Sequence, residues 1–150
     1  MKVICVSGTP GTGKTKLARS IAEEKNLKYI DVNKVISEYK LSEGYDKKRD
    51  CMIVDVDRLN EVLIGIIRKQ EKGNHKGIII DSHLSHYLPP EYVDECIITK
   101  CSLPELKKRL RARGYSQKKI RENMDAEIFD TCRIEAIELG HKVIVVWTDQ

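Results

Sequence analysis

One octapeptide near the start of the chain has the residue types and spacing that bind phosphate groups. Gly8-Thr9-Pro10-Gly11-Thr12-Gly13-Lys14-Thr15 matches the pattern GxxxxGK followed by Ser or Thr. Its glycines allow successive backbone N–H groups to point at an anion, and a helix N-terminus adds partial positive charge. Lys14 would neutralise the β- and γ-phosphates, and the Thr15 hydroxyl would ligate magnesium. We therefore predict ATP and Mg²⁺ binding, with nucleotide contacts from Gly8, Gly11, Thr12, Gly13, Lys14, Thr15 and Lys16.

A second group of polar residues directly follows the apolar run 78–80. Asp81 ends this run, and an acid at the end of a buried strand faces the ligand crevice of this kind of fold. We predict that Asp81 belongs to the magnesium shell. His83 could orient a water or an acceptor oxygen towards the γ-phosphate, although a histidine after a strand is often a loop residue without a role. We expect His86 to be a surface or packing residue.

Strand and helix patterns alternate along the chain, which positions these groups at one edge of a parallel sheet. The predicted strands are Lys2–Ser7, Lys28–Val32, Gly77–Asp81, Glu95–Thr99 and Lys142–Trp147. The predicted helices begin at Gly13 or Lys14, cover Val56–Lys72 and Leu103–Arg113, and extend from about Ser116 to near Gly140. The fold class is therefore α/β: a three-layer α/β/α P-loop NTPase with a five-stranded parallel sheet, in one domain covering residues 1–150.

Composition excludes several other classes of protein. The chain has 150 residues, 41% hydrophobic and 33% charged, with a formal net charge of +4. No apolar stretch approaches the roughly 18–20 residues that span a bilayer, and the segment before the octapeptide is too short for a signal peptide. We expect a cytoplasmic location, or a nuclear one in a eukaryote, and no membrane partner. Five cysteines without a CxxC pair argue against a zinc site.

Further motifs give the chain a resemblance to a known family. The octapeptide, Asp81-Ser82-His83 and Arg113-Gly114-Tyr115 are accompanied by matches at Gly44-Tyr45-Asp46, Cys51, Asp57-Arg58, Arg109-Leu110, Asn123, Glu127, Ile128 and Phe129. With these residues the chain resembles the adenylate kinase 6 family along nearly its whole length. Members are small nuclear or archaeal adenylate kinase-like ATPases that are linked to assembly of the small ribosomal subunit.

The resemblance implies roles for two further regions and for two arginines. Residues 31–54 would bind the nucleoside monophosphate, and residues 112–122 would form a short lid over ATP. Arg113 would contact ATP, and Arg109 would stabilise the transferring phosphoryl group, since a guanidinium suits phosphate. The alternative for both arginines is a solvated helix face, because basic residues crowd this segment.

Two departures from the family concern the acceptor side and the end of the chain. Ser37 stands where a family arginine is expected to help bind the monophosphate, which weakens the case for AMP more than the case for ATP. The sequence ends at Gln150, just after the last predicted strand, where family members continue into a helix that covers the sheet.

The leading functional hypothesis is phosphoryl transfer from MgATP to AMP, giving two ADP. A second hypothesis is an ATPase switch in small-subunit rRNA maturation, in which His83 orients water and hydrolysis releases a basic small-subunit ribosomal protein. Such a protein would bring an indirect association with pre-ribosomal RNA, and candidate acids for it are Glu122, Asp125, Glu127 and Asp130. A shikimate- or nucleoside-kinase relative is the third hypothesis, and a non-catalytic nucleotide-binding scaffold is the least favoured.

Overall fold

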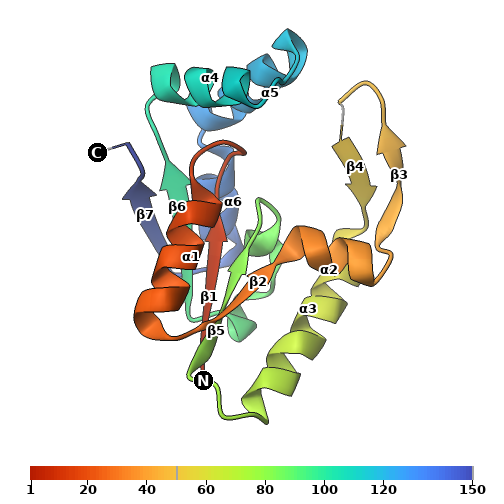
Figure 1. Ribbon diagram of the computed structural model, residues 1–150, viewed down its shortest axis with the longest axis vertical. Helices are drawn as coiled ribbons and strands as arrows, with labels where there is room; N and C mark the ends of the chain where they lie inside the picture. The colour runs from red at the N-terminus through yellow and green to blue at the C-terminus, as the bar shows by residue number, and fades with distance from the viewer. Residues whose placement is uncertain (50, 150) are drawn as a thin grey trace.

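A parallel sheet forms the centre of the molecule (Figure 1). Within residues 1–49 and 51–149, which the computed structural model describes, this sheet has five strands in the order β2-β5-β1-β6-β7. Every pairing between neighbours is parallel. The strands are β1 (Lys2–Ser7), β2 (Lys28–Asp31), β5 (Gly77–Asp81), β6 (Glu95–Lys100) and β7 (Val143–Trp147). The predicted α/β fold and its five strands are confirmed. Residues 50 and 150, which belong to the predicted domain, lie outside the described residues.

Helices cover both faces of this sheet, which makes three layers. Successive side chains of a strand point to opposite faces. Ile4 of β1 therefore packs with Ala18 and Ala22 of α1 (Lys14–Lys25). On the other face, the core joins Cys5 to side chains of α3 (Val56–Glu71) and to Ala136 of α6 (Thr131–Leu139). Both faces of the central strands are buried, as continuous apolar runs predict.

The polar region after β2 contains regular structure that the sequence patterns did not predict. It folds into α2 (Val32–Glu38) and an antiparallel hairpin of β3 (Ser42–Asp46) and β4 (Cys51–Val54). This hairpin forms a sheet of its own, separate from the central one. It stands beyond the carboxyl ends of the parallel strands, across from α4 (Leu103–Ala112) and α5 (Gln117–Ile128) (Figure 1).

The single helix predicted from about Ser116 to Gly140 is wrong, because the chain turns between α5 and α6. Asp130 adopts a left-handed conformation with φ of 57°. Aspartate tolerates this conformation better than most residues, and here its carboxylate also accepts a hydrogen bond from the Lys100 ammonium at 2.9 Å. Gly140 ends α6 as predicted. Two 3₁₀ turns, Ser85–Tyr87 and Pro90–Tyr92, complete the described elements, and none of the described helices has the length and apolar character to cross a membrane.

Candidate active site

The phosphate loop connects β1 to α1 and is packed tightly against the end of β6. Gly8 has φ of 140°, and a Cβ atom added there would lie 2.5 Å from Thr99 Oγ1. A larger residue would be strained and would push the loop off the sheet. The Thr12 hydroxyl donates to the Thr9 carbonyl at 2.6 Å and contacts the Thr99 hydroxyl at 2.7 Å. These hydrogen bonds within the protein hold the loop in its shape.

Lys14 folds back over this loop. Its ammonium donates to the carbonyl oxygens of Gly8 at 2.9 Å and Thr9 at 3.0 Å. Burial lowers the pKa of Lys14 to about 8, although the nearby Asp81 carboxylate opposes this shift. The side chain remains predominantly cationic at pH 7. Phosphate oxygens are stronger acceptors than neutral carbonyls, so an anion on the loop would compete for the ammonium.

Thr15 and Asp81 form the predicted magnesium pair. The Thr15 hydroxyl donates to Asp81 Oδ2 at 2.8 Å. Asp81 occupies the last position of β5, paired in register with Val6 of β1. Both groups offer the hard oxygen atoms that magnesium prefers, so this pair fits Mg²⁺ together with phosphate oxygens and waters. No cluster of three or more metal-ligating acids, histidines or cysteines occurs in the part of the chain that the structure describes.

Tyr29 is a contact of Asp81 that the sequence analysis missed. Its hydroxyl donates to Asp81 Oδ2 at 2.6 Å, the same oxygen that accepts from Thr15. Burial, followed by the Asp81 carboxylate, raises the pKa of Tyr29 to about 12. A tyrosine in a short β pattern carries no distinctive signal. Only the pairing of β2 with β5 could have indicated this contact.

The two histidines after β5 have different surroundings. His83 faces the cavity, and desolvation, with the Lys14 ammonium, lowers its pKa to about 4. The imidazole of His83 is therefore neutral at pH 7, although it still meets the solvent of the cavity. His86 is buried, so of its two predicted alternatives it is a packing residue. Its Nδ1 lies 2.7 Å from the Ser7 hydroxyl.

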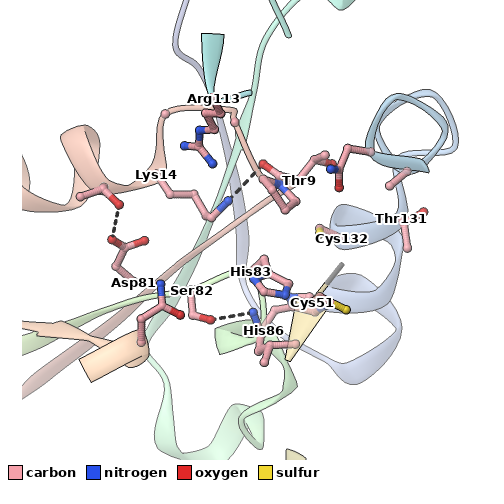
Figure 2. Close-up of a pocket in the computed structure, with 18 of the residues that line it drawn as sticks. Thr9, Lys14, Cys51, Asp81, Ser82, His83, His86, Arg113, Thr131 and Cys132 are labelled. Atoms are coloured by element: carbon pink, nitrogen blue, oxygen red, sulfur yellow. Dashed lines mark hydrogen bonds between the residues drawn. The ribbon is translucent and has the colours of Figure 1, made fainter. Parts of the chain in front are cut away.

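One cavity of about 1,040 Å³ lies at the carboxyl ends of the strands, and its lining includes Lys14, Thr15, Asp81, His83 and His86. Figure 2 shows Lys14 reaching back to Thr9, with Asp81 and His83 on one side of it and Arg113 on the other. One wall comes from the loop and from the predicted lid. The opposite wall comes from the predicted monophosphate region, with contributions from Asp31, Asn33, Arg49 and Cys51.

Known proteins resemble this chain along most of its length. Residues 4–130 match the family model described as an AAA domain. A protein of Methanosarcina barkeri named “Putative adenylate kinase” is 40% identical over 146 residues, which cover 97% of this chain and 76% of the relative. The adenylate kinase isoenzyme 6 homolog of Caenorhabditis elegans is 35% identical over 142 residues, with 95% and 76% coverage. The chain belongs to the adenylate kinase-like family.

Solved structures extend the comparison to the fold. A shikimate kinase from Bacteroides thetaiotaomicron superposes with a TM-score of 0.60 at 13% identity and covers 99% of this chain and 87% of its own. A sugar kinase from Janibacter gives a TM-score of 0.65 at 19% identity, with 100% and 87% coverage. At these identities the likeness concerns the P-loop kinase fold alone, which the adenylate kinase-like family shares.

The two arginines predicted from the adenylate kinase-like resemblance lie in different places. Arg113 lines the cavity, and its side chain lies 3.5 Å from the Tyr115 hydroxyl. Arg109 is not among the described residues that line the cavity. It pairs with Glu105 at 3.1 Å and donates to the Thr148 hydroxyl at 3.0 Å and, more weakly, to the Gly11 carbonyl at 3.4 Å. The structure therefore brings Arg113, but not Arg109, together with Lys14, and a catalytic role for Arg109 stays a prediction.

The predicted group of four acids is not a uniform acidic surface. Glu127 is buried and accepts a hydrogen bond from the Lys100 ammonium at 2.9 Å. The Thr9 hydroxyl also donates to Glu127, at 3.4 Å, which connects α5 to the phosphate loop. Asp130 shares the same Lys100 ammonium. Only Glu122 and Asp125 remain exposed.

Proposed function

We propose that this chain transfers the γ-phosphoryl group of MgATP to AMP and releases two molecules of ADP. The observation that supports this proposal is a single cavity with the phosphate loop on one wall and Asp31, Asn33, Arg49 and Cys51 on the other. Its volume, about 1,040 Å³, lies just above the range of roughly 300–1,000 Å³ that sites for one small molecule occupy. Such a cavity has room for a donor and an acceptor that meet near Asp81 and His83.

The protein would act by positioning its substrates and neutralising charge. Backbone N–H groups of the loop hold the phosphates of ATP, and Lys14 leaves the carbonyls of Gly8 and Thr9 to bind them. Thr15 and Asp81 would hold Mg²⁺, which neutralises charge on the phosphate oxygens. The AMP phosphate attacks the γ-phosphorus directly, so no covalent enzyme intermediate forms.

The lid completes the donor side in this proposal. The segment 112–122 contains the turn at Gly114 and the first part of α5, and it contributes Arg113, Tyr115 and Lys119 to the cavity wall. Arg113 would bind the ATP phosphates, and Tyr115 offers an aromatic surface near the nucleotide. Closure of this segment would exclude water from the transferring phosphoryl group.

ATP hydrolysis is a second activity of the same site. A neutral His83 at the cavity wall can accept a hydrogen bond from water or from an acceptor oxygen. Without AMP, a water oriented by His83 would take the place of the acceptor. The cell could then use the chain as an ATPase switch in small-subunit rRNA maturation, in the cytoplasm or, in a eukaryote, in the nucleus.

The partner in such a switch would be a small-subunit ribosomal protein, with pre-ribosomal RNA associated only indirectly. The family resemblance and the exposed acids Glu122 and Asp125 on α5 support a basic partner. The double variant Glu122→Lys, Asp125→Lys would lose co-purification with that protein, and Asp125→Lys alone, which is off the cavity wall, would weaken it while ATP binding persists. Retention of the partner by the double variant would exclude this surface.

Product analysis tests the proposed function. The purified chain is incubated with MgATP, with and without AMP, and the nucleotides are separated by chromatography, with Lys14→Ala as the control. Consumption of AMP with two ADP formed for each AMP supports the proposal. Untouched AMP, with ATP slowly giving ADP and phosphate, would leave hydrolysis as the activity, and a screen of other acceptors would separate a different small-molecule kinase from both.

A further inference from the structure

The acceptor of the proposed reaction brings a phosphate dianion next to the triphosphate of ATP, so its wall of the cavity needs a positive charge. Basic side chains from four parts of the described chain line the cavity: Lys14, Lys16, Arg19, Arg49, Arg113 and Lys119. Lys14 and Lys16 belong to the phosphate loop and the first turn of α1. Arg113 and Lys119 belong to the lid. We assign these four residues to the wall of the cavity that binds the donor, ATP.

Arg19 and Arg49 remain for the acceptor. The guanidinium of Arg19 lies 4.8 Å from the centre of the Tyr29 ring, which is a cation–π contact. This contact keeps Arg19 beside β2 and the Thr15–Asp81 pair. Arg49 belongs to the turn between β3 and β4, inside the segment that supplies the acceptor wall.

The turn holds Arg49 in position while leaving its guanidinium weakly engaged. Asp46 Oδ1 accepts hydrogen bonds from the backbone N–H groups of Lys48 at 3.0 Å and Arg49 at 3.2 Å, which fixes the backbone of the turn. The Arg49 side chain is 73% exposed, and its Nε lies 4.0 Å from Asp46 Oδ2. An exposed pair at this distance contributes little. The guanidinium can therefore move to a phosphate without losing a strong partner.

Other side chains of the same segment that could bind the acceptor phosphate are not among the described residues that line the cavity. Lys34, Lys40, Lys47 and Lys48 are exposed and are not among the described residues that line the cavity. Ser37, on α2, is exposed, carries no charge and is likewise not among them. Among the described residues from 31 to 54, Arg49 is thus the one cationic side chain on the cavity wall.

We propose that Arg49 binds the phosphate of the acceptor nucleotide and is the residue of the β3–β4 hairpin that determines acceptor affinity. This inference rests on the proposed phosphoryl transfer to a nucleoside monophosphate. The planar guanidinium can donate two parallel hydrogen bonds to phosphate oxygens, which a lysine cannot do. Binding of the acceptor draws the hairpin towards the parallel strands and places the phosphate opposite the loop.

The test compares Arg49→Ala, Arg49→Lys and the matched control Lys47→Ala, which removes a positive charge from the same turn but off the cavity wall. We expect Arg49→Ala to raise the KM for AMP by about 10- to 100-fold, because a charge-assisted hydrogen bond is lost. The KM for AMP of Arg49→Lys should lie between the values for Arg49→Ala and for the unmodified chain. Lys47→Ala should change the KM for AMP by less than about twofold. The KM for ATP serves as the internal reference in all variants.

Three results would overturn the inference, and they have different meanings. Equal effects of Arg49→Ala and Lys47→Ala on the KM for AMP would show that Arg49 adds only to the overall charge. A KM for ATP that rises as much as the KM for AMP would place Arg49 on the donor. If the unmodified chain forms no ADP from AMP and binds no AMP in calorimetry, the proposed function itself falls, and this inference with it.

Discussion

The two walls of the cavity are built in opposite ways. On the loop side, Ser7 and Thr12 are fully buried, and Asp81, which is 7% exposed, accepts two hydrogen bonds from protein hydroxyls. On the hairpin side, Tyr45 is 53% exposed and Met52 is 48% exposed, although these two residues face each other across the strand pair. One wall is therefore preorganised, whereas the other is an isolated hairpin that presents apolar side chains to solvent.

This difference suggests a division of labour between the two walls. A preorganised set of donors stabilises developing charge without reorganisation during the reaction, so it belongs where the phosphoryl group is transferred. A two-stranded hairpin has little stability of its own and depends on packing against a larger body. It is suited to move when the acceptor binds. The same contrast predicts that substitutions on the loop side affect turnover most, and that substitutions on the hairpin side affect acceptor affinity.

The largest effect is expected for Lys14→Ala. Loss of the ammonium that the loop holds should reduce turnover of ATP by at least about a thousandfold, because it removes the main charge stabilising the phosphates. The measurement is steady-state ADP formation. Lys25→Ala, in the last turn of the same helix, is the control and should change the rate by less than about twofold. Comparable losses in both variants would contradict a specific role for Lys14.

Asp81→Asn should lower the rate by about a hundredfold and raise the Mg²⁺ concentration needed for half-maximal activity. Asparagine keeps the shape of the side chain and can still accept from Thr15, so the loss reports mainly the missing charge. Tyr29→Phe removes a hydroxyl from the same carboxylate and should lower the rate only about threefold. If Tyr29→Phe lowered the rate as much as Asp81→Asn, the loss would come from the hydrogen bonds of the Asp81 carboxylate rather than from its charge.

The pH dependence of ATP binding should report on Lys14. The pKa of Lys14 in the folded chain, about 8, lies below its usual value, so the ammonium is lost as the pH rises through 8. Phosphate favours the charged form, so ATP binding takes up a proton and weakens above this pH. Calorimetry should show the Kd for ATP rising roughly tenfold between pH 7.5 and 9. Lys14→Arg, whose side chain stays charged, should bind with a flat profile over this interval, and a flat profile in the unmodified chain would contradict the assignment.

The smallest effect is expected on the hairpin side, for Ser37→Arg. Ser37 lies four residues after Asn33 on α2, so the two share a helix face, and Asn33 lines the cavity. A long cationic side chain at position 37 could reach the acceptor and should lower the KM for AMP by about threefold. Ser20→Arg adds the same charge on the exposed surface of α1 as a control. Equal changes in both variants would mean that only the overall charge matters.

Some parts of the candidate site follow from local sequence. The glycines, Lys14 and Thr15 lie in one continuous motif, and Asp81 ends an apolar run whose length indicates a buried strand. The structure brings Thr15 and Asp81 to hydrogen-bonding distance, 66 residues apart in the chain. Such a contact could be expected because parallel strands align their carboxyl ends at one edge of a sheet.

The parts that depend on distant partners could not be read from the sequence. The α5–α6 turn has neither glycine nor proline, and its left-handed Asp130 is stabilised by Lys100, which lies on β6. Glu127 was predicted as an acid that could bind a basic partner, and its burial against the same lysine could not be expected because the two residues are 27 positions apart. The β3–β4 hairpin was missed because most of its side chains are exposed, so it lacks the alternation of a half-buried strand.

Binding of a bisubstrate dinucleotide, two adenosines joined by five phosphates, tests most directly whether the two walls form one site. In calorimetry we expect one dinucleotide per chain and displacement by ATP and by AMP, with Lys14→Ala weakening binding of the donor half and Arg49→Ala binding of the acceptor half. A dinucleotide displaced by ATP alone, with AMP binding undisturbed or absent, would contradict a shared donor–acceptor cavity.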